Sequence, residues 1–91
     1  MNLVRLDDEC CALLLEVQSS RIVQLQALFE SFEGLGVVRT MDIKQSLVSI
    51  LTTNSQTTCC LELLEEIRPT IPWRFAETAL AAETISDFIK S

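Results

Sequence analysis

Apolar residues recur at three- and four-residue steps along most of this chain, and short polar segments separate the repeats. This spacing places apolar side chains on one face of a helix. In residues 21–32, for example, Ile22, Leu25, Leu28, Phe29 and Phe32 would share one face. Spacing and breakers together predict five helical segments, at about 7–17, 21–32, 40–51, 56–67 and from Pro72 onward, with Ile85, Phe88 and Ile89 in a short sixth piece.

Breakers are scarce, since the chain has only two glycines and two prolines. This scarcity favours helices over a strand-rich fold, which needs many tight turns. We therefore predict an all-α fold, a compact antiparallel bundle of five to six short helices. The 91 residues suit a single helical interaction domain spanning 1–91.

The fourth predicted helix shows the expected division into two sides. Its inward positions are Cys60, Leu63, Leu64 and Ile67, and its outward positions are Glu62, Glu65 and Glu66. Pro69 and Pro72 follow, and proline cannot donate the backbone hydrogen bond that a continuing helix needs.

Composition and charge narrow the choice of partner. Hydrophobic residues make up 48% of the chain, and thirteen acidic against seven basic residues give a net charge of -6. So few cations form no basic face for nucleic acid or for anionic lipid, so we expect neither as a partner.

The acidic start MNLVRLDDE does not resemble a signal peptide, and no apolar run is long enough to span a bilayer. The expected location is cytoplasmic.

Candidate chemistry is sparse. The chain has no histidine, and its cysteines form two adjacent pairs, Cys10–Cys11 and Cys59–Cys60, a spacing poorly suited to holding one zinc ion. In each pair, one cysteine is expected to face the core and the other a flank. The Glu65–Glu66 pair is interpreted as a solvated helix face. We predict no catalytic residues, no metal site, no cofactor and no enzymatic activity.

An EF-hand-like arrangement is one alternative. Leu25, Leu28 and Phe32, followed by Gly36 and then Asp42–Ile43, follow its helix–loop–helix register. A calcium loop needs about twelve residues with oxygen ligands at alternating early positions. The segment 33–42 is shorter, and its only carboxylates are Glu33 and Asp42. This alternative predicts a calcium-insensitive module that binds an amphipathic helix of a partner protein.

From Met41 onward the sequence resembles the second half of a caspase recruitment domain (CARD) of the death-fold superfamily. The resemblance rests on MDIKQSLVSI, a polar Thr/Ser/Asn loop, CLELLEEI, WRFAETAL and ISDFI. It is nearest to the domains of helicase-like cytosolic RNA sensors and their membrane adaptor. The link EGLGVVRT is longer than in that pattern, and WRFAETAL is one residue short of it.

The resemblance implies a protein-binding module that acts by homotypic CARD–CARD association in innate-immune or apoptotic signalling, with growth into homo-oligomers or filaments. The expected partner is a CARD or another helical domain with a basic surface, because complementary charge steers association. The residues predicted to contact it are Arg39, Lys44, Glu62, Glu65 and Arg68.

Overall fold

The computed structural model describes residues 3–77, which form five strands and two α-helices. The strands are β1 (Leu3–Arg5), β2 (Cys10–Val17), β3 (Val37–Asp42), β4 (Leu47–Thr53) and β5 (Trp73–Phe75). The helices are α1 (Ile22–Glu30) and α2 (Thr57–Ile67), and short 3-10 turns at Ser19–Arg21 and Asn54–Gln56 lead into them.

The strands form one antiparallel sheet in the order β1-β2-β4-β3, with β5 also paired to β2. β1 pairs with Cys11–Leu13 and β5 with Leu15–Val17, so the two short strands follow one another along the same edge of β2. From β2 onward, the order strand–helix–strand–strand–helix–strand is the split β-α-β arrangement of ferredoxin-like folds.

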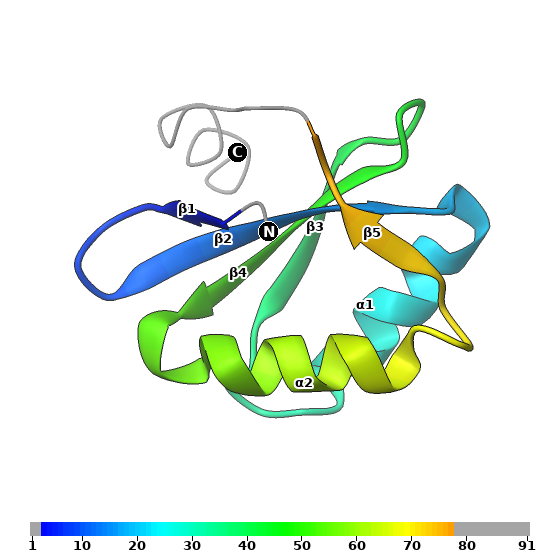
Figure 1. Ribbon diagram of the computed structural model, residues 1–91. Coiled ribbons are helices and arrows are strands. Elements are labelled where there is room, and N and C mark those ends of the chain that lie inside the picture. Colours follow the sequence, from blue (N-terminus) through cyan, green and yellow to red (C-terminus); the bar gives the residue numbers. More distant parts are fainter. Residues whose placement is uncertain (1–2, 78–91) are drawn as a thin grey trace.

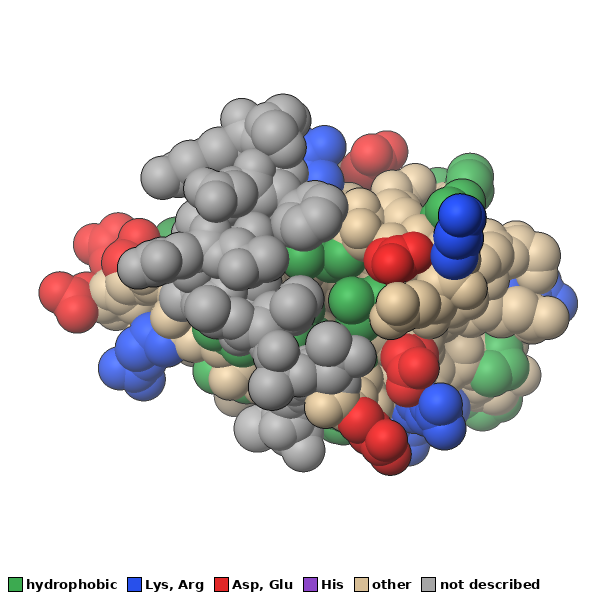
Figure 2. Space-filling model, turned by 90° about the horizontal axis from the view of Figure 1, so that it is seen from above, with side chains coloured by type: hydrophobic (Ala, Val, Ile, Leu, Met, Phe, Trp, Pro, Cys, Tyr) green, Lys and Arg blue, Asp and Glu red, His purple; other side chains and the backbone are tan. Residues whose placement is uncertain are grey.

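Both helices lie on the same side of the sheet (Figure 1). The main core fills the space between the helices and the sheet. Its larger members are Leu13, Leu15, Leu25, Phe29, Val48, Ile50, Leu64 and Trp73. A second cluster lies on the other side of the sheet and contains Ala12, Leu14, Met41, Leu47 and Ala76. In Figure 2, which views that side, hydrophobic side chains lie toward the middle and charged ones around them.

The predicted all-α bundle is wrong, and strand β2 shows one reason. Residues 11–15, predicted to be helical, form the centre of the sheet, and each of them is fully buried. A strand that is buried on both faces reads as a continuous apolar run instead of an alternating one. Such a run in CCALLL cannot be distinguished from a buried helix by periodicity.

The helix predicted at 40–51 is also wrong, because a tight turn lies within it. Asp42 accepts hydrogen bonds through Oδ1 from the backbone N–H groups of Lys44 (2.9 Å) and Gln45 (3.3 Å). Ser46 completes the turn with a left-handed φ of 57°. The turn uses neither glycine nor proline. β4 then begins at Leu47, in a segment rich in β-branched residues, which favour strands.

The fifth predicted helix is wrong at its expected start. Strand β5 occupies Trp73–Phe75, where the fifth helix was expected to begin. Its continuation through Ala79 and Leu80, and the piece with Ile85, Phe88 and Ile89, lie outside the described residues. Strand β3 occupies the place where the exit helix of an EF-hand would stand, so the EF-hand arrangement is wrong as well, whereas binding to an amphipathic helix of a partner stays a prediction. A CARD is a bundle of six helices, and this sheet contradicts the resemblance.

The predictions for two helices and for the cysteine pairs are confirmed. α1 and α2 lie within the segments expected at 21–32 and 56–67. All four cysteines are free; Cys11 and Cys60 are buried, Cys59 is exposed and Cys10 lies between these extremes.

Two hydroxyl groups on β4 give a matched test of the packing. Ser49 is fully buried, and within residues 3–77 its Oγ is the one buried side-chain N or O atom without a hydrogen-bond partner. Thr52 Oγ1 instead donates to the Leu35 carbonyl at 2.7 Å. An unpaired buried hydroxyl costs about 1 kcal/mol or more. Ser49→Ala should therefore raise the free energy of unfolding by about 1 kcal/mol, and Thr52→Val should lower it by about 1–2 kcal/mol.

Urea unfolding of the two variants measures both changes. A loss of stability in Ser49→Ala as large as that in Thr52→Val would contradict the environment described for Ser49.

Candidate functional site

Reactive side chains are not grouped in the described part of the chain. Residues 3–77 contain no set of three His, Cys, Asp or Glu side chains placed to hold a metal ion. Burial raises the pKa of the Cys60 thiol, although a hydrogen bond with Thr52 opposes the shift. The thiol therefore stays protonated, and it donates to the Leu35 carbonyl at 3.1 Å. This cysteine has a structural role in the core.

The outward side of α2 is the most distinctive surface. Cys60 and Leu64 are buried against the sheet, and Glu62, Glu65 and Glu66 are exposed on the opposite side. This division follows from the helical period, which puts residues three and four apart on one face. The turn after α1 packs beside α2; it adds the exposed Phe32 to the surface and the largely buried Leu35 to the lining of a hollow there. We call the outward side chains of α2, together with Phe32 and Leu35, the α2 surface.

The α2 surface contains two apolar hollows. The first, of about 210 Å³, is lined by Phe32, Leu35, Cys59, Glu62, Leu63 and Glu66. The second, wider and more open at about 500 Å³, is lined by Thr58, Leu61, Glu62, Glu65 and Glu66. Glu62 and Glu66 line both hollows, so this pair of carboxylates, one helical turn apart, forms a ridge between them.

Hydrogen bonds to one carbonyl hold the first hollow in place. The Leu35 oxygen accepts from Thr52 Oγ1 of β4 at 2.7 Å and from Cys60 Sγ of α2 at 3.1 Å. Immediately after Leu35, a Cβ on Gly36 would come within 3.1 Å of the Leu51 carbonyl oxygen, so glycine permits this close approach. The loop is thus fixed against both elements, and the hollow does not depend on the loop being rearranged.

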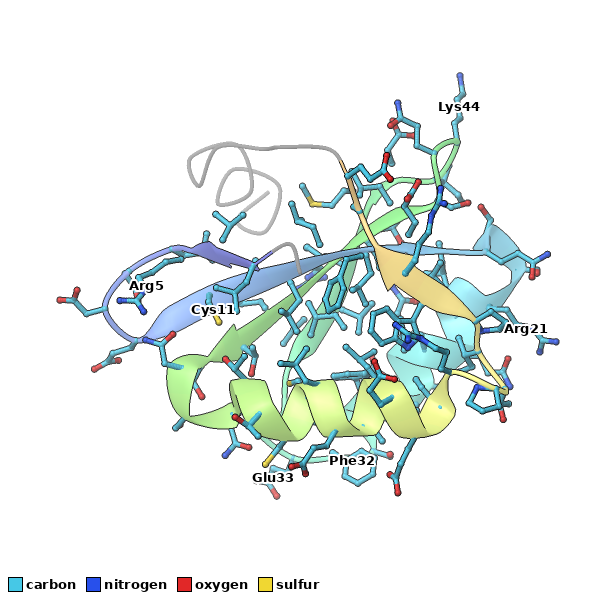
Figure 3. The ribbon with its side chains drawn as sticks, in the orientation of Figure 1. Arg5, Cys11, Arg21, Phe32, Glu33 and Lys44 are labelled. Carbon is cyan, nitrogen blue, oxygen red and sulfur yellow. The ribbon has the colours of Figure 1, made fainter. Side chains whose placement is uncertain are left out.

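Phe32 was predicted to be a buried member of the second helix, and this is wrong. α1 ends at Glu30, and Phe32 lies in the following turn with 46% of its surface exposed. Figure 3 shows it beside α2, on the side away from the sheet. Phe32 was assigned to the inward face because it continues the helical spacing of Leu25, Leu28 and Phe29. The sequence contains no capping signal to show that the helix ends at Glu30 and not at Phe32.

No cation among the described residues forms an ion pair with the carboxylates of the ridge. Within residues 3–77, the ion pairs are Glu65–Arg68 (3.3 Å) and Glu16–Arg74 (2.8 Å), and neither involves Glu62 or Glu66. Like charges four residues apart destabilise a helix by about 0.2–0.5 kcal/mol. The ridge therefore carries a small cost for the isolated fold, and a cation from outside the chain would relieve it.

The structure brings together three of the five predicted contact residues. Glu62 and Glu65 lie on the α2 surface, and Arg68 follows α2, where its guanidinium lies 4.0 Å from the centre of the Trp73 ring. Lys44 is at the tip of the β3–β4 turn, on the other side of the sheet from α2 (Figure 3). Arg39 is exposed on the edge strand β3.

Arg39 has a second interpretation. In the sheet formed by residues 3–77, β3 is an edge strand, and its pairing with β4 is interrupted by an irregularity between Thr40 and Asp42. Charged side chains and bulges are common ways to discourage pairing between exposed sheet edges. We therefore interpret Arg39 as protection of this edge.

Another hollow, of about 450 Å³, lies beside β5 and is lined in part by Glu16, Gln45, Trp73 and Arg74. The two charged groups in its lining, Glu16 and Arg74, form an ion pair in which Arg74 Nε donates to Glu16 Oε2 at 2.8 Å. This hydrogen bond and the carboxylate charge raise the pKa of Arg74. The hollow thus offers no unpaired charge to a ligand, in contrast to the α2 surface.

Comparison with known proteins gives one match. The sequence profile of a family described as a domain of unknown function (DUF4911) matches residues 15–71, which run from the second half of β2 to the loop after α2. No curated protein and no solved structure matches the chain. Within the described residues, neither helix has the length and apolar character needed to cross a membrane.

Proposed function

We propose that this chain, which belongs to the DUF4911 family, is a protein–protein interaction module that binds its partner through the α2 surface. One observation carries the proposal: apolar hollows on both sides of an unneutralised pair of carboxylates, exposed on a helix that the core holds rigidly. Apolar hollows supply contact area, and charge at their rim supplies specificity and faster association.

Two expectations from the sequence remain in this proposal, a partner with a basic surface and a cytoplasmic location. A protein partner with a basic surface suits a chain with a net charge of -6, and a cytoplasmic location suits four free cysteines. The CARD–CARD mode of binding and its signalling roles were implied only by the family resemblance. Because the sheet contradicts that resemblance, they are not part of this proposal. The absence of enzymatic activity and the assembly into homo-oligomers stay predictions.

Photo-cross-linking in the organism that encodes the chain tests the proposal. A photoreactive phenylalanine analogue replaces Phe32 in one sample and Ile43 in another. Ile43 is a suitable control because it is 64% exposed but lies in the β3–β4 turn, away from α2. We expect an adduct with another polypeptide from position 32 and none from position 43, because only the first lies on the α2 surface. Equal adducts from both positions, or an adduct from position 43 alone, would exclude α2 as the contact.

A further inference from the structure

We infer that the occupant of the α2 surface is a basic amphipathic α-helix of a partner protein, which crosses α2 and places one apolar side chain in each hollow. This inference rests on the proposed function and adds the chemistry and secondary structure of the bound segment. Three features of the surface lead to it: the position of the hollows, their polarity and the charge between them.

The position of the hollows sets the spacing of the ligand's apolar side chains. The hollows lie on opposite sides of the Glu62–Glu66 ridge on one helix, so their separation is at most the diameter of a helix with its side chains, about 10–12 Å. On a partner helix, residues i and i+7 are about 10.5 Å apart along the axis and on the same face. A helix that crosses α2 steeply therefore carries two apolar side chains at the required distance.

The ridge sets the charge of the residues between them. Positions i+3 and i+4 of the crossing helix lie on the same face as i and i+7, and they would lie over Glu62 and Glu66. Lysine or arginine at these positions would neutralise two carboxylates that no described cation pairs with. Acidic residues there would add like charges at close range, which opposes binding.

The chemistry of the first hollow sets the size of the side chain. Phe32 and Leu63 form its apolar walls, and its volume of about 210 Å³ suits one large aliphatic or aromatic side chain. The ligand pattern is therefore apolar at i, basic at i+3 and i+4, and apolar at i+7. An extended strand would fit less well, because its successive side chains point to opposite faces.

A labelled synthetic peptide of about 18 residues tests the inference. It carries Leu at i and i+7 and Lys at i+3 and i+4 in a helix-forming Ala/Gln background. Two control peptides change one feature each: Glu replaces both Lys, or Ala replaces both Leu. Fluorescence anisotropy measures binding to the whole chain and to two variants, Glu62→Lys/Glu66→Lys and Phe32→Ser, whose folding is checked by circular dichroism.

We expect the first peptide to bind at least about tenfold more tightly than either control, and each variant to weaken it by about tenfold or more. A third variant, Asp8→Lys/Glu77→Lys, makes the same change in net charge at residues that line neither hollow, and it should bind like the unmodified chain. Equal binding of the Leu-free peptide would show attraction by charge alone and overturn the inference. No binding of any peptide, together with an adduct at position 32, would reject the helical ligand and leave the proposed function standing.

Discussion

Replacing Trp73 by alanine is expected to lower the free energy of unfolding by about 3–5 kcal/mol, the largest loss for any single change considered for this chain. Trp73 is only 6% exposed and belongs to the main core. Its indole N–H donates to the Leu64 carbonyl at 2.6 Å. That carbonyl lies in the last turn of α2, where backbone oxygens lack helical partners. One side chain therefore joins β5 to the end of α2.

Two neighbours add to the loss. The Trp73 and Phe75 rings meet edge to face at 5.0 Å, and the Arg68 guanidinium lies 4.0 Å from the Trp73 ring centre. Such contacts contribute about 0.5–1.5 kcal/mol each. Since domains of this size are commonly stable by about 5–15 kcal/mol, Trp73→Ala should bring the chain close to unfolding.

Urea unfolding followed by far-ultraviolet circular dichroism measures this loss without using tryptophan fluorescence. Trp73→Phe is the matched control, because it keeps an aromatic ring and removes the N–H donor. We expect it to lose less stability than Trp73→Ala. A loss below about 1 kcal/mol in Trp73→Ala would mean that the indole does not hold α2 to the sheet.

The second large effect concerns binding. In Glu62→Lys/Glu66→Lys, both carboxylates of the ridge become cations, and they would face the basic residues of the partner. Removing two favourable charge contacts and adding two repulsive ones should weaken the affinity by about 100-fold or more. Isothermal titration calorimetry with the protein recovered by cross-linking at position 32 gives the dissociation constant.

Folding should be nearly unchanged in this double variant. It replaces one pair of like charges at i and i+4 by another on an exposed helix face, so the free energy of unfolding should change by less than about 0.5 kcal/mol. The same urea experiment checks this. A large loss of stability would show that the carboxylates serve the fold, and the loss of binding could then not be assigned to the contact.

The parts of the fold that could be predicted from the sequence are those with one buried face. In α2, Cys60 and Leu64 are buried and Glu62, Glu65 and Glu66 are exposed. The alternation of apolar and acidic residues in the sequence therefore shows the helical period. α1 shows the same period through Ile22, Leu25 and Phe29, all buried. Amphipathic elements of this kind show their structure in their own sequence.

The sheet was missed because its central strand has no polar face. β2 is covered on one side by the helices and on the other by the second cluster, so its apolar run shows no alternation. The β3–β4 turn was missed for a different reason: it depends on the Asp42 carboxylate and on a left-handed Ser46 instead of glycine or proline. The strong strand signal in LVSILTT was the evidence available for a different assignment.

The candidate site could be predicted only in part. The exposed glutamates follow from the helical period, but the hollows require Phe32 and Leu35, which reach α2 through the tertiary fold. Hydrogen bonds from Thr52 and Cys60 place that loop, and both partners are distant from it in sequence. The spacing of residues within one segment of the sequence does not reveal a contact between segments that are distant in sequence.

We propose that the Glu62–Glu66 ridge and its two hollows form the partner contact. The most direct test is the ratio of the partner's dissociation constants for Glu62→Lys/Glu66→Lys and for Asp8→Lys/Glu77→Lys, two variants with the same net charge. We expect a ratio of about 100 or more, with the control close to the unmodified chain. A ratio near one, with both variants folded, would rule out the ridge as the contact.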